Sequence, residues 1–326
     1  MKTASIAIIG GLLLMQATSF AYMSPTTGKF LSRDPIEESG GLNLSGYVNN
    51  NPVSYTDPFG LALYAFDGTG NDGRHLPDGM GTSVYLLMQG YGGQNVVYEP
   101  GVGSALGTRT IGGAFGLGAT ARVEDAYTRF MQIYKQGSGD TTIDIIGFSR
   151  GAAEAREFAN LIYQRGDGSG LTTRHSTYGK NTITTTSWGT PCSIPQIRFV
   201  GLFDTVATSL HSFDLNLPPN VQMGRQAKAW DEKRYSFPVT SIFPGLSGQN
   251  LAEQWFPGDH SDIGHNHLTL NNDLVWGPLE YIRSAGVSVG VPFGPLPPHT
   301  LTGDTTPHNL AGTFPFLLIP NTAPRH

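Results

Sequence analysis

Apolar residues along this chain fall into short continuous runs and into longer stretches with helical spacing. Residues 63–66, 143–148 and 197–203 are short apolar runs that end in turn residues, and each predicts a buried β-strand. Residues 122–134 place apolar side chains three and four positions apart, and residues 152–163 are rich in alanine, so both stretches predict helices. Strands that alternate with helices indicate an α/β fold, with a mostly parallel sheet flanked by helices.

Three other stretches carry neither pattern. Residues 22–61 are dense in Gly, Asn, Pro and Asp, which predicts a series of tight turns. Residues 165–195 are rich in Gly, Ser and Thr, and we expect an inserted loop or lid there rather than an element of the core. From about residue 286 the chain is rich in proline, and we expect this tail to wrap the surface of a domain that spans residues 62–326.

The composition limits the classes of protein to which the chain can belong. Its 326 residues carry 20 Lys and Arg against 25 Asp and Glu, a net charge of -5, and only 14% of the residues are charged. The negative net charge excludes a basic nucleic-acid binder, so we expect no nucleic-acid partner. The low fraction of charged residues excludes a disordered tail and a coiled coil. The 43 glycines predict glycine-rich loops, and the single cysteine, Cys192, excludes an internal disulfide.

The first 21 residues have the layout of a signal peptide. Lys2 precedes an apolar run at residues 6–15, and Ser19 and Ala21 are the small residues that a cleavage site after Ala21 requires. The apolar run is shorter than the roughly 18 to 20 residues that a membrane-spanning helix needs. We therefore expect an exported protein, secreted or periplasmic. The alternative is an apolar leader without function upstream of a gene fragment.

A Gly-x-Ser-x-Gly motif lies between a predicted strand and a predicted helix, in the sequence DIIGFSRGAA at residues 144–153. This context is typical of a nucleophile elbow, in which Gly147 and Gly151 leave room for a strained turn that exposes Ser149 at the carboxyl edge of the sheet. The amide of Arg150, at the start of the helix, is then placed to stabilise an oxyanion. The alternative is a chance match of a loose pattern in a chain with 43 glycines.

A serine is a weak nucleophile at neutral pH, so it needs a base and an acid that orients the base. In this fold they follow in the order serine, acid, histidine. Asp204 ends a predicted strand, which places it at the same edge of the sheet as Ser149 and makes it the candidate acid. The alternative role for Asp204 is to cap a following helix. Asp262 is the reserve acid. His260, in a turn-rich loop, is the candidate base, and His211 is its rival.

Four motifs in this order resemble the α/β-hydrolase family that contains type VI secretion phospholipase effectors. They are FDGTGN at residues 66–71, GFSRGA at 147–152, GLFDTV at 201–206 and WFPGDHSDIG at 255–264. The resemblance covers residues 62 to about 282. It implies that Ser149 is the nucleophile, Asp204 the acid and His260 the base. It also implies that Gly68 and Thr69 lie beside the oxyanion site.

The same resemblance implies the substrate and the partners. The substrate is expected to be a phospholipid or another lipid ester, with contact to a membrane surface that is peripheral at most. An immunity protein is an expected partner, no cofactor is expected, and delivery by a secretion system is the alternative to export by a signal peptide. Four apolar residues before His260 are candidates to receive an acyl chain: Phe237, Ile242, Phe243 and Leu246. The alternative is that they pack in the core.

Residues 265–267 depart from that family, because the chain reads HNH where members usually have more glycines. Together with His260 and Asp262, His265 and His267 offer a competing interpretation as zinc ligands. Neither an HExxH helix nor a pair of cysteines accompanies them, and His260 cannot serve both as general base and as ligand. We therefore expect no metal at this loop.

A second resemblance concerns residues 22–61. The sequences GKFLSRDP at 28–35, GLN at 41–43, NNP at 50–52 and DPFGL at 57–61 resemble the junction segment at the C-terminal end of the shell in Rhs-repeat proteins. In that family autoproteolysis after the last of these motifs frees an enclosed toxin, and acidic residues like Asp34 and Asp57 are implicated. The resemblance implies a boundary after Leu61, with the functional domain following it.

Three functional hypotheses remain. The leading one is a serine esterase of the phospholipase type, acting through an acyl-enzyme. A carboxylesterase that acts on small esters is the alternative among enzymes. A noncatalytic surface or interaction protein, a remnant of an Rhs locus whose hydrolase domain only packs or binds, is the alternative from a different class.

We predict that the purified protein stays joined across Leu61 and Ala62. Autoproteolysis needs an aspartate with a raised pKa and a peptide bond held in attack geometry, and both depend on a rigid, desolvated enclosure. Residues 22–61 are too short and too rich in Gly and Asn to form one. Intact-mass measurement checks this prediction. A species that begins at Ala62 and disappears in Asp34→Ala or Asp57→Ala contradicts it.

Overall fold

The computed structural model describes residues 23–24, 29–30, 61–75, 81–104, 118–136, 142–178, 181–208, 210, 212–265 and 273–308. The chain divides into two compact units, Met1–Thr56 and Asp57–His326. In the first unit, β1 (Met23–Ser24) and β2 (Lys29–Phe30) pair antiparallel. The predicted signal peptide and most of the predicted junction segment lie outside the described residues, so both stay predictions.

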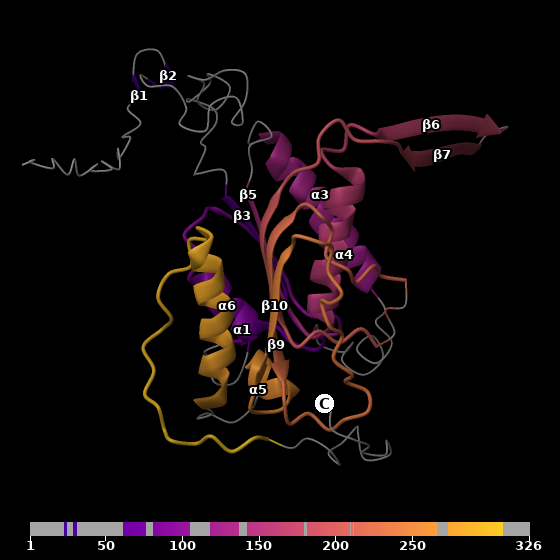
Figure 1. Cartoon of the computed structure of the whole chain (residues 1–326). Coiled ribbons are helices and arrows are strands. Elements are labelled where there is room, and N and C mark those ends of the chain that lie inside the picture. Colours follow the sequence, from indigo (N-terminus) through magenta and orange to yellow (C-terminus); the bar gives the residue numbers. More distant parts are fainter. Residues whose placement is uncertain are drawn as a thin grey trace, which may run out of the picture. The chain divides into compact units, whose positions relative to one another are not determined.

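A six-stranded sheet forms the centre of the second unit (Figure 1). Every neighbouring pair of its strands is parallel, which confirms the predicted fold class. In spatial order the strands are β10 (Asn250–Phe256), β9 (Val221–Ala229), β8 (Ile197–Phe203), β5 (Thr142–Phe148), β3 (Leu61–Phe66) and β4 (Asn95–Glu99). The three strands that the sequence predicts are β3, β5 and β8, which lie side by side in the middle of the sheet.

Helices cover both faces of this sheet. The α-helices of the described residues are α1 (Ser83–Gln89), α3 (Ala119–Gln136), α4 (Arg150–Arg165), α5 (His260–Gly264) and α6 (Trp276–Ser288). Figure 1 shows α3 and α4 on one face and α1 and α6 on the other, with α5 beyond the carboxyl ends of the strands. Among the described residues, no helix combines the length and the apolar character that crossing a membrane requires.

Alternate residues of each central strand pack against opposite helical layers. In β3, Tyr64 and Phe66 belong to the core under α3 and α4, whereas Leu63 and Ala65 belong to the core under α1 and α6, and all four are fully buried. A strand buried on both faces reads as a continuous apolar run, which is why residues 63–66 gave so clear a signal. Burial of apolar surface on both faces therefore fixes the register of the sheet and the position of its carboxyl edge.

The insertion expected at residues 165–195 is a β-hairpin. Its strands β6 (Leu171–Tyr178) and β7 (Asn181–Trp188) pair antiparallel. The hairpin follows the last residue of α4, a helix of 16 residues that begins next to Ser149, so about 24 Å of helix separates the two. Figure 1 shows the hairpin at the end of the molecule away from α5. The expectation of a lid is therefore not supported by the position of this segment.

The expected C-terminal tail begins where α6 ends. Residues 289–308 contain no helix, and Figure 1 shows them passing along the outside of α6. Phe293 forms an antiparallel bridge with Tyr91, and at the far end His308 Nδ1 lies 2.7 Å from Asp262 Oδ1. The tail therefore connects the α6 layer to α5.

Close packing of α4 against the end of β3 depends on the absence of a side chain at Gly151. A Cβ there would lie 2.4 Å from the carbonyl oxygen of Asp67 and 2.5 Å from that of Phe66, and both are backbone atoms. Any larger residue must push the loop after β3 away from the start of α4. Gly277, which occupies the same second position in α6, has only ordinary contacts, the nearest at 3.4 Å from Phe256.

We predict that Gly151→Ala destabilises the protein by about 1 to 3 kcal/mol, the usual range for overpacking a core. Gly277→Ala should be neutral or slightly stabilising, because alanine is the better helix former and meets no close contact. Thermal unfolding of the two variants beside the wild type checks this. Equal melting temperatures for both variants would contradict the packing role of Gly151.

Candidate active site

The carboxyl edge of the sheet brings the three candidate catalytic residues together. Ser149 directly follows β5, Asp204 directly follows the adjacent strand β8, and His260 begins α5 shortly after β10 in the chain. Parallel strands end at a common edge, so side chains that follow them meet although they are far apart in the chain. Ser149 and His260 are 111 residues apart and in hydrogen-bonding contact.

Ser149 occupies a strained backbone conformation, with φ of 58° and ψ of -127°. A positive φ is uncommon for a residue other than glycine and costs on the order of 1 to 3 kcal/mol. The surroundings enforce it, because the Ser149 amide donates to the Phe203 carbonyl at 3.0 Å and its carbonyl accepts from the Val206 amide at 3.2 Å. The turn between β5 and α4 thus holds the hydroxyl in one place, as the motif predicts.

Asp204 also has a positive φ, of 43°, and its carboxylate is fully buried. Its amide donates to the Ala227 carbonyl at 2.7 Å, and its Oδ1 accepts from the Ala229 amide at 3.0 Å. Both contacts come from the neighbouring strand β9 and direct Oδ2 toward His260. No helix begins at residues 205–208, so Asp204 is not the helix cap that we considered as the alternative.

Hydrogen bonds connect the three side chains in a single chain. His260 Nδ1 lies 2.6 Å from Asp204 Oδ2, and His260 Nε2 lies 2.7 Å from Ser149 Oγ. An ionised carboxylate can only accept, so the imidazole proton belongs on Nδ1 and Nε2 is left to accept from the serine hydroxyl. All three residues are at most 5% exposed, so competing water is largely excluded from these bonds.

Aromatic rings enclose the imidazole of His260. The Phe148 ring lies 4.8 Å from it at an angle of 32°, and the Phe237 ring lies 4.9 Å away at 65°. Phe148 in turn sits against Gly264, where a Cβ would lie 2.0 Å from the ring. These contacts restrict rotation of the imidazole and hold its two nitrogens in line with Asp204 and Ser149.

The segment that carries His260 is a short helix rather than the loop that the sequence predicted. Asp259 caps α5, accepting from the amides of Ser261 at 2.8 Å and Asp262 at 3.0 Å. The Asp259 amide in turn donates to Asp262 Oδ2 at 2.8 Å, which completes a capping box. A helix of five residues has almost no intrinsic stability, so these side-chain bonds determine its position.

The loop after β3, predicted to lie beside an oxyanion site, is organised by a buried carboxylate. Asp67 Oδ2 accepts from the hydroxyls of Thr82 at 2.8 Å and Tyr98 at 2.7 Å, and Oδ1 accepts from the Gly68 amide at 2.8 Å. Burial raises the pKa of Asp67, and these hydrogen bonds counteract the rise. The Gly68 amide is therefore engaged with Asp67, and the amides of Thr69 and Arg150 are the better candidates for an oxyanion.

Of the predicted alternatives, the structure describes Asp262 and His265. Asp262 binds the Asp259 amide and His308, so it stabilises α5 and the tail rather than orienting an imidazole at Ser149. His265 ends α5 with a φ of 50°, and His211 and His267 lie outside the described residues. Among the residues that the structure does describe, no group of three or more His, Cys, Asp or Glu side chains is arranged to hold a metal ion.

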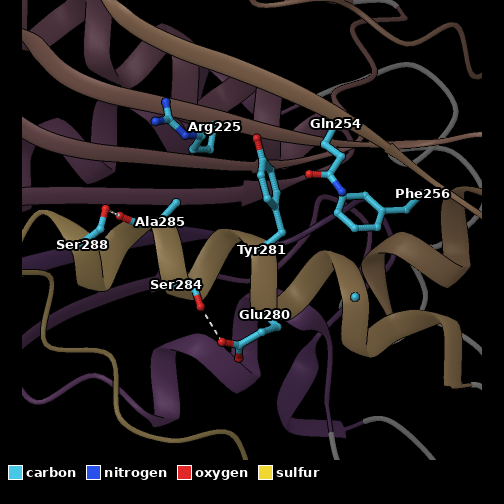
Figure 2. Close-up of a pocket in the computed structure, with 9 residues that line it drawn as sticks. Arg225, Gln254, Phe256, Glu280, Tyr281, Ser284, Ala285 and Ser288 are labelled. Carbon is cyan, nitrogen blue, oxygen red and sulfur yellow. Dashed lines mark hydrogen bonds between the residues drawn. The ribbon is translucent and has the colours of Figure 1, made fainter.

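A groove elsewhere on the surface is distinct from this site. It has a volume of about 590 Å³ and lies between β9 and β10 on one side and α6 on the other (Figure 2). Figure 2 shows Tyr281 rising from α6 between Arg225 and Gln254, with Glu280 and Ser284 bonded below. None of the three candidate catalytic residues lines this groove.

Sequence reasoning missed the residues that support the site. Glu232 accepts a hydrogen bond from the His260 amide, yet its sequence reads as a charged surface loop and gave no signal. Thr82 and Tyr98 come from elements that were not predicted. The helix cap could have been predicted, because Asp262 follows Asp259 by three residues. This spacing is the pattern of a capping box.

Comparison with known families adds to this geometry. Residues 63–283, more than half of the chain, match the family described as "T6SS, Phospholipase effector Tle1-like, catalytic domain". The chain belongs to this family. The match begins within β3 and ends within α6, so it includes residues from all six strands of the sheet and all three candidate catalytic residues.

The comparison with solved structures includes one likeness with a TM-score of 0.50, which is a likeness of fold alone. An uncharacterized protein from Pseudomonas aeruginosa is 18% identical with a TM-score of 0.50, over 72% of this chain and 46% of that one. The Tle1 effector bound to the VgrG spike of the type 6 secretion system is 24% identical with a TM-score of 0.40, over 63% of this chain and 50% of that one. This Tle1-like chain therefore spans about half the length of these two proteins.

A curated relative matches a much shorter stretch. Toxin subunit YenC2 of Yersinia entomophaga is 49% identical over 43 residues, which make up 13% of this chain and 4% of that protein. The chain therefore spans only a small part of the curated relative that it matches.

We predict that a chelator leaves the melting temperature and any activity of the protein unchanged. His260 is in contact with Ser149 and Asp204, and Asp262 with Asp259 and His308, so neither is oriented toward a shared ion. Thermal unfolding with and without EDTA checks this. Loss of stability on chelation that zinc or calcium restores would overturn it.

Proposed function

We propose that this Tle1-like chain is a serine esterase of the phospholipase type. The observation that carries the proposal is the hydrogen-bonded chain Ser149, His260 and Asp204, with distances of 2.7 and 2.6 Å, at the carboxyl edge of an α/β-hydrolase-like sheet. Membership in a family of phospholipase effector catalytic domains supports the lipid ester as substrate. A serine in this setting has the base and the orienting acid that nucleophilic attack requires.

The reaction proceeds in two steps. His260 Nε2 takes the hydroxyl proton while Ser149 Oγ attacks the ester carbonyl carbon, and Asp204 stabilises the imidazolium that results. The tetrahedral oxyanion collapses, His260 returns the proton to the leaving alkoxide, and an alcohol departs from the acyl-enzyme. Water then loses a proton to His260 and attacks the acyl carbon. The carboxylic acid leaves, and the serine hydroxyl is restored.

The oxyanion needs donors fixed before the reaction begins. The amide of Arg150 follows Ser149 at the start of α4, where the helix dipole also favours negative charge. The loop at Thr69 is the second contributor, because Asp67, through its bonds to Thr82 and Tyr98, holds it against the start of α4. Preorganised donors of this kind typically contribute about 10²- to 10³-fold each to turnover.

The four residues that the sequence suggested as acyl-chain contacts differ in their position and exposure. Phe237 touches the His260 ring and is the candidate nearest the reacting atoms. Ile242 is only 1% exposed and belongs to the core under α4, so it packs rather than binds substrate. Phe243 and Leu246 are 50% and 54% exposed on the segment that follows.

The family supports a proposal for how the protein is delivered and which partners it contacts. A type VI secretion effector family and a Tle1 structure solved on a VgrG spike support delivery by a secretion system in contact with a spike protein. Export by the predicted signal peptide is the competing route. An immunity protein that blocks the site would protect the producing cell.

Substitution of the three residues tests the mechanism. We predict that Ser149→Ala and His260→Ala each lower kcat by several orders of magnitude and that Asp204→Asn costs somewhat less, because a triad acts as a unit. Asp262→Asn is the control, since it weakens α5 without touching the imidazole. If Asp262→Asn abolished turnover while Asp204→Asn kept it, the assignment of the acid would be wrong.

The substrate class is tested on defined esters. Wild-type protein is assayed on phosphatidylcholine and phosphatidylethanolamine vesicles and on a soluble short-chain ester. We expect fatty-acid release from phospholipid that Ser149→Ala lacks. Turnover of the short-chain ester alone would indicate a small-ester carboxylesterase, and no turnover of any ester would favour a noncatalytic protein.

A further inference from the structure

The loop that follows β9, residues 230–238, contacts the segment that carries His260. Asp231 donates from its amide to the Gly258 carbonyl at 2.9 Å and accepts from the Gly258 amide at 2.8 Å. Two residues of this loop that would be expected on the surface, Glu232 and Arg234, are only 2% and 8% exposed. Charged side chains are rarely so buried unless they are paired, so their contacts call for an explanation.

Glu232 supplies an acceptor that α5 needs. The amides of Ser261 and Asp262 are satisfied by Asp259, but the first amide of the helix, that of His260, has its acceptor in Glu232 Oε2 at 3.2 Å. The unsatisfied amides of a helix start need partners when they are buried. Glu232 therefore holds the backbone of the residue whose imidazole bridges Ser149 and Asp204.

Arg234 holds Glu232 in place through a bidentate salt bridge. Its Nε and Nη2 donate to the two oxygens of Glu232 at 2.9 and 2.6 Å, and its amide donates at 2.6 Å. Burial opposes ionisation of Glu232, but these bonds and the guanidinium charge outweigh it, so the pKa lies below its usual value. The guanidinium also lies 3.9 Å from the centre of the Phe237 ring, which contacts the His260 ring.

We propose that Glu232 and Arg234 form an ion pair that positions His260 and balances the charge around its imidazole. The inference rests on the proposed function, in which His260 is the general base. Glu232 fixes the start of α5 and favours the imidazolium, Arg234 opposes it, and Phe237 transmits the position of the pair to the ring. Neither charged residue touches the reacting atoms, so both are positioning residues.

The charged and titratable groups around His260 come from every element packed there. Asp204 binds the imidazole directly, Asp259 and Asp262 are engaged in the cap of α5, and His265 ends that helix. Glu232 and Arg234 differ from these because they form a pair of opposite charges on one loop. Removal of either charge leaves the other unbalanced, so the two substitutions shift the imidazole pKa in opposite directions. A pair whose charges act on the packing alone, too screened to reach the imidazole, would leave the His260 pKa unchanged in both variants.

The experiment measures the pKa of His260 by NMR titration of the folded protein, with its resonance identified by its absence in His260→Gln. Glu232→Gln, which keeps an acceptor for the His260 amide, should lower this pKa by about half a unit or more. Arg234→Gln, which keeps a donor for Glu232, should raise it. This readout needs no turnover, so it distinguishes failure of the ion pair from failure of the proposed function.

Kinetics on a soluble ester provide the second readout. Glu232→Ala, which removes both charge and acceptor, should lower kcat by tenfold or more with KM changed less than threefold. Glu232→Gln should keep most of kcat near the pH optimum and move the acid limb of the kcat/KM profile to lower pH. Rescue by the conservative variant is the result expected for positioning.

The Asp144 and Arg198 pair is the matched control. It is a buried Arg–carboxylate contact of the same kind, but it lies on β5 and β8 at the start of these strands, far from Ser149. Asp144→Asn should lower the melting temperature without moving the His260 pKa. Unchanged pKa values in both Glu232→Gln and Arg234→Gln, or shifts in the same direction, would overturn the proposal, as would an equal shift in Asp144→Asn.

Discussion

The hydrogen bonds of His260 to Ser149 and Asp204 are the constraint on which the candidate site depends. The three residues come from the ends of β5 and β8 and from a five-residue helix, so no single element can hold them in contact. The sheet fixes two of the positions because burial on both faces determines its register. The third depends on the capping of α5 by Asp259, Asp262 and Glu232, which replaces the cooperativity that so short a helix lacks.

Strain in the backbone is confined to the same place. Ser149, Asp204 and His265 are the described residues other than glycine with positive φ, and the first two belong to the hydrogen-bonded chain while the third ends the helix of His260. Conformations of this kind persist only where surrounding bonds enforce them. The amide of Ser149 bonds to Phe203 and that of Asp204 to Ala227, so each strand end stabilises its neighbour.

The central strands and the positions of Ser149, Asp204 and His260 were predictable because they carry local signals. Residues 197–203 coincide with β8, since an apolar run buried on both faces has clear ends. The helix at His260 was not predictable by periodicity, because five residues do not complete two turns. The strands within the insertion were not predicted for another reason: Ser and Thr suggest a loop by composition, but threonine also favours strands, and residues 171–178 pair with residues 181–188 as a hairpin. Glu232 left no signal because His260, whose amide it binds, lies 28 residues further along the chain.

The most direct measurement is the location of the covalent adduct formed with a fluorophosphonate probe, mapped by peptide mass spectrometry. The probe modifies a serine only when a base activates it, so it reports the hydrogen-bonded chain and not the choice of lipid. We expect one adduct, on Ser149, that is absent in Ser149→Ala and strongly slowed in His260→Ala. Absence of an adduct on Ser149 in the folded wild-type protein would contradict an activated serine at the edge of this sheet.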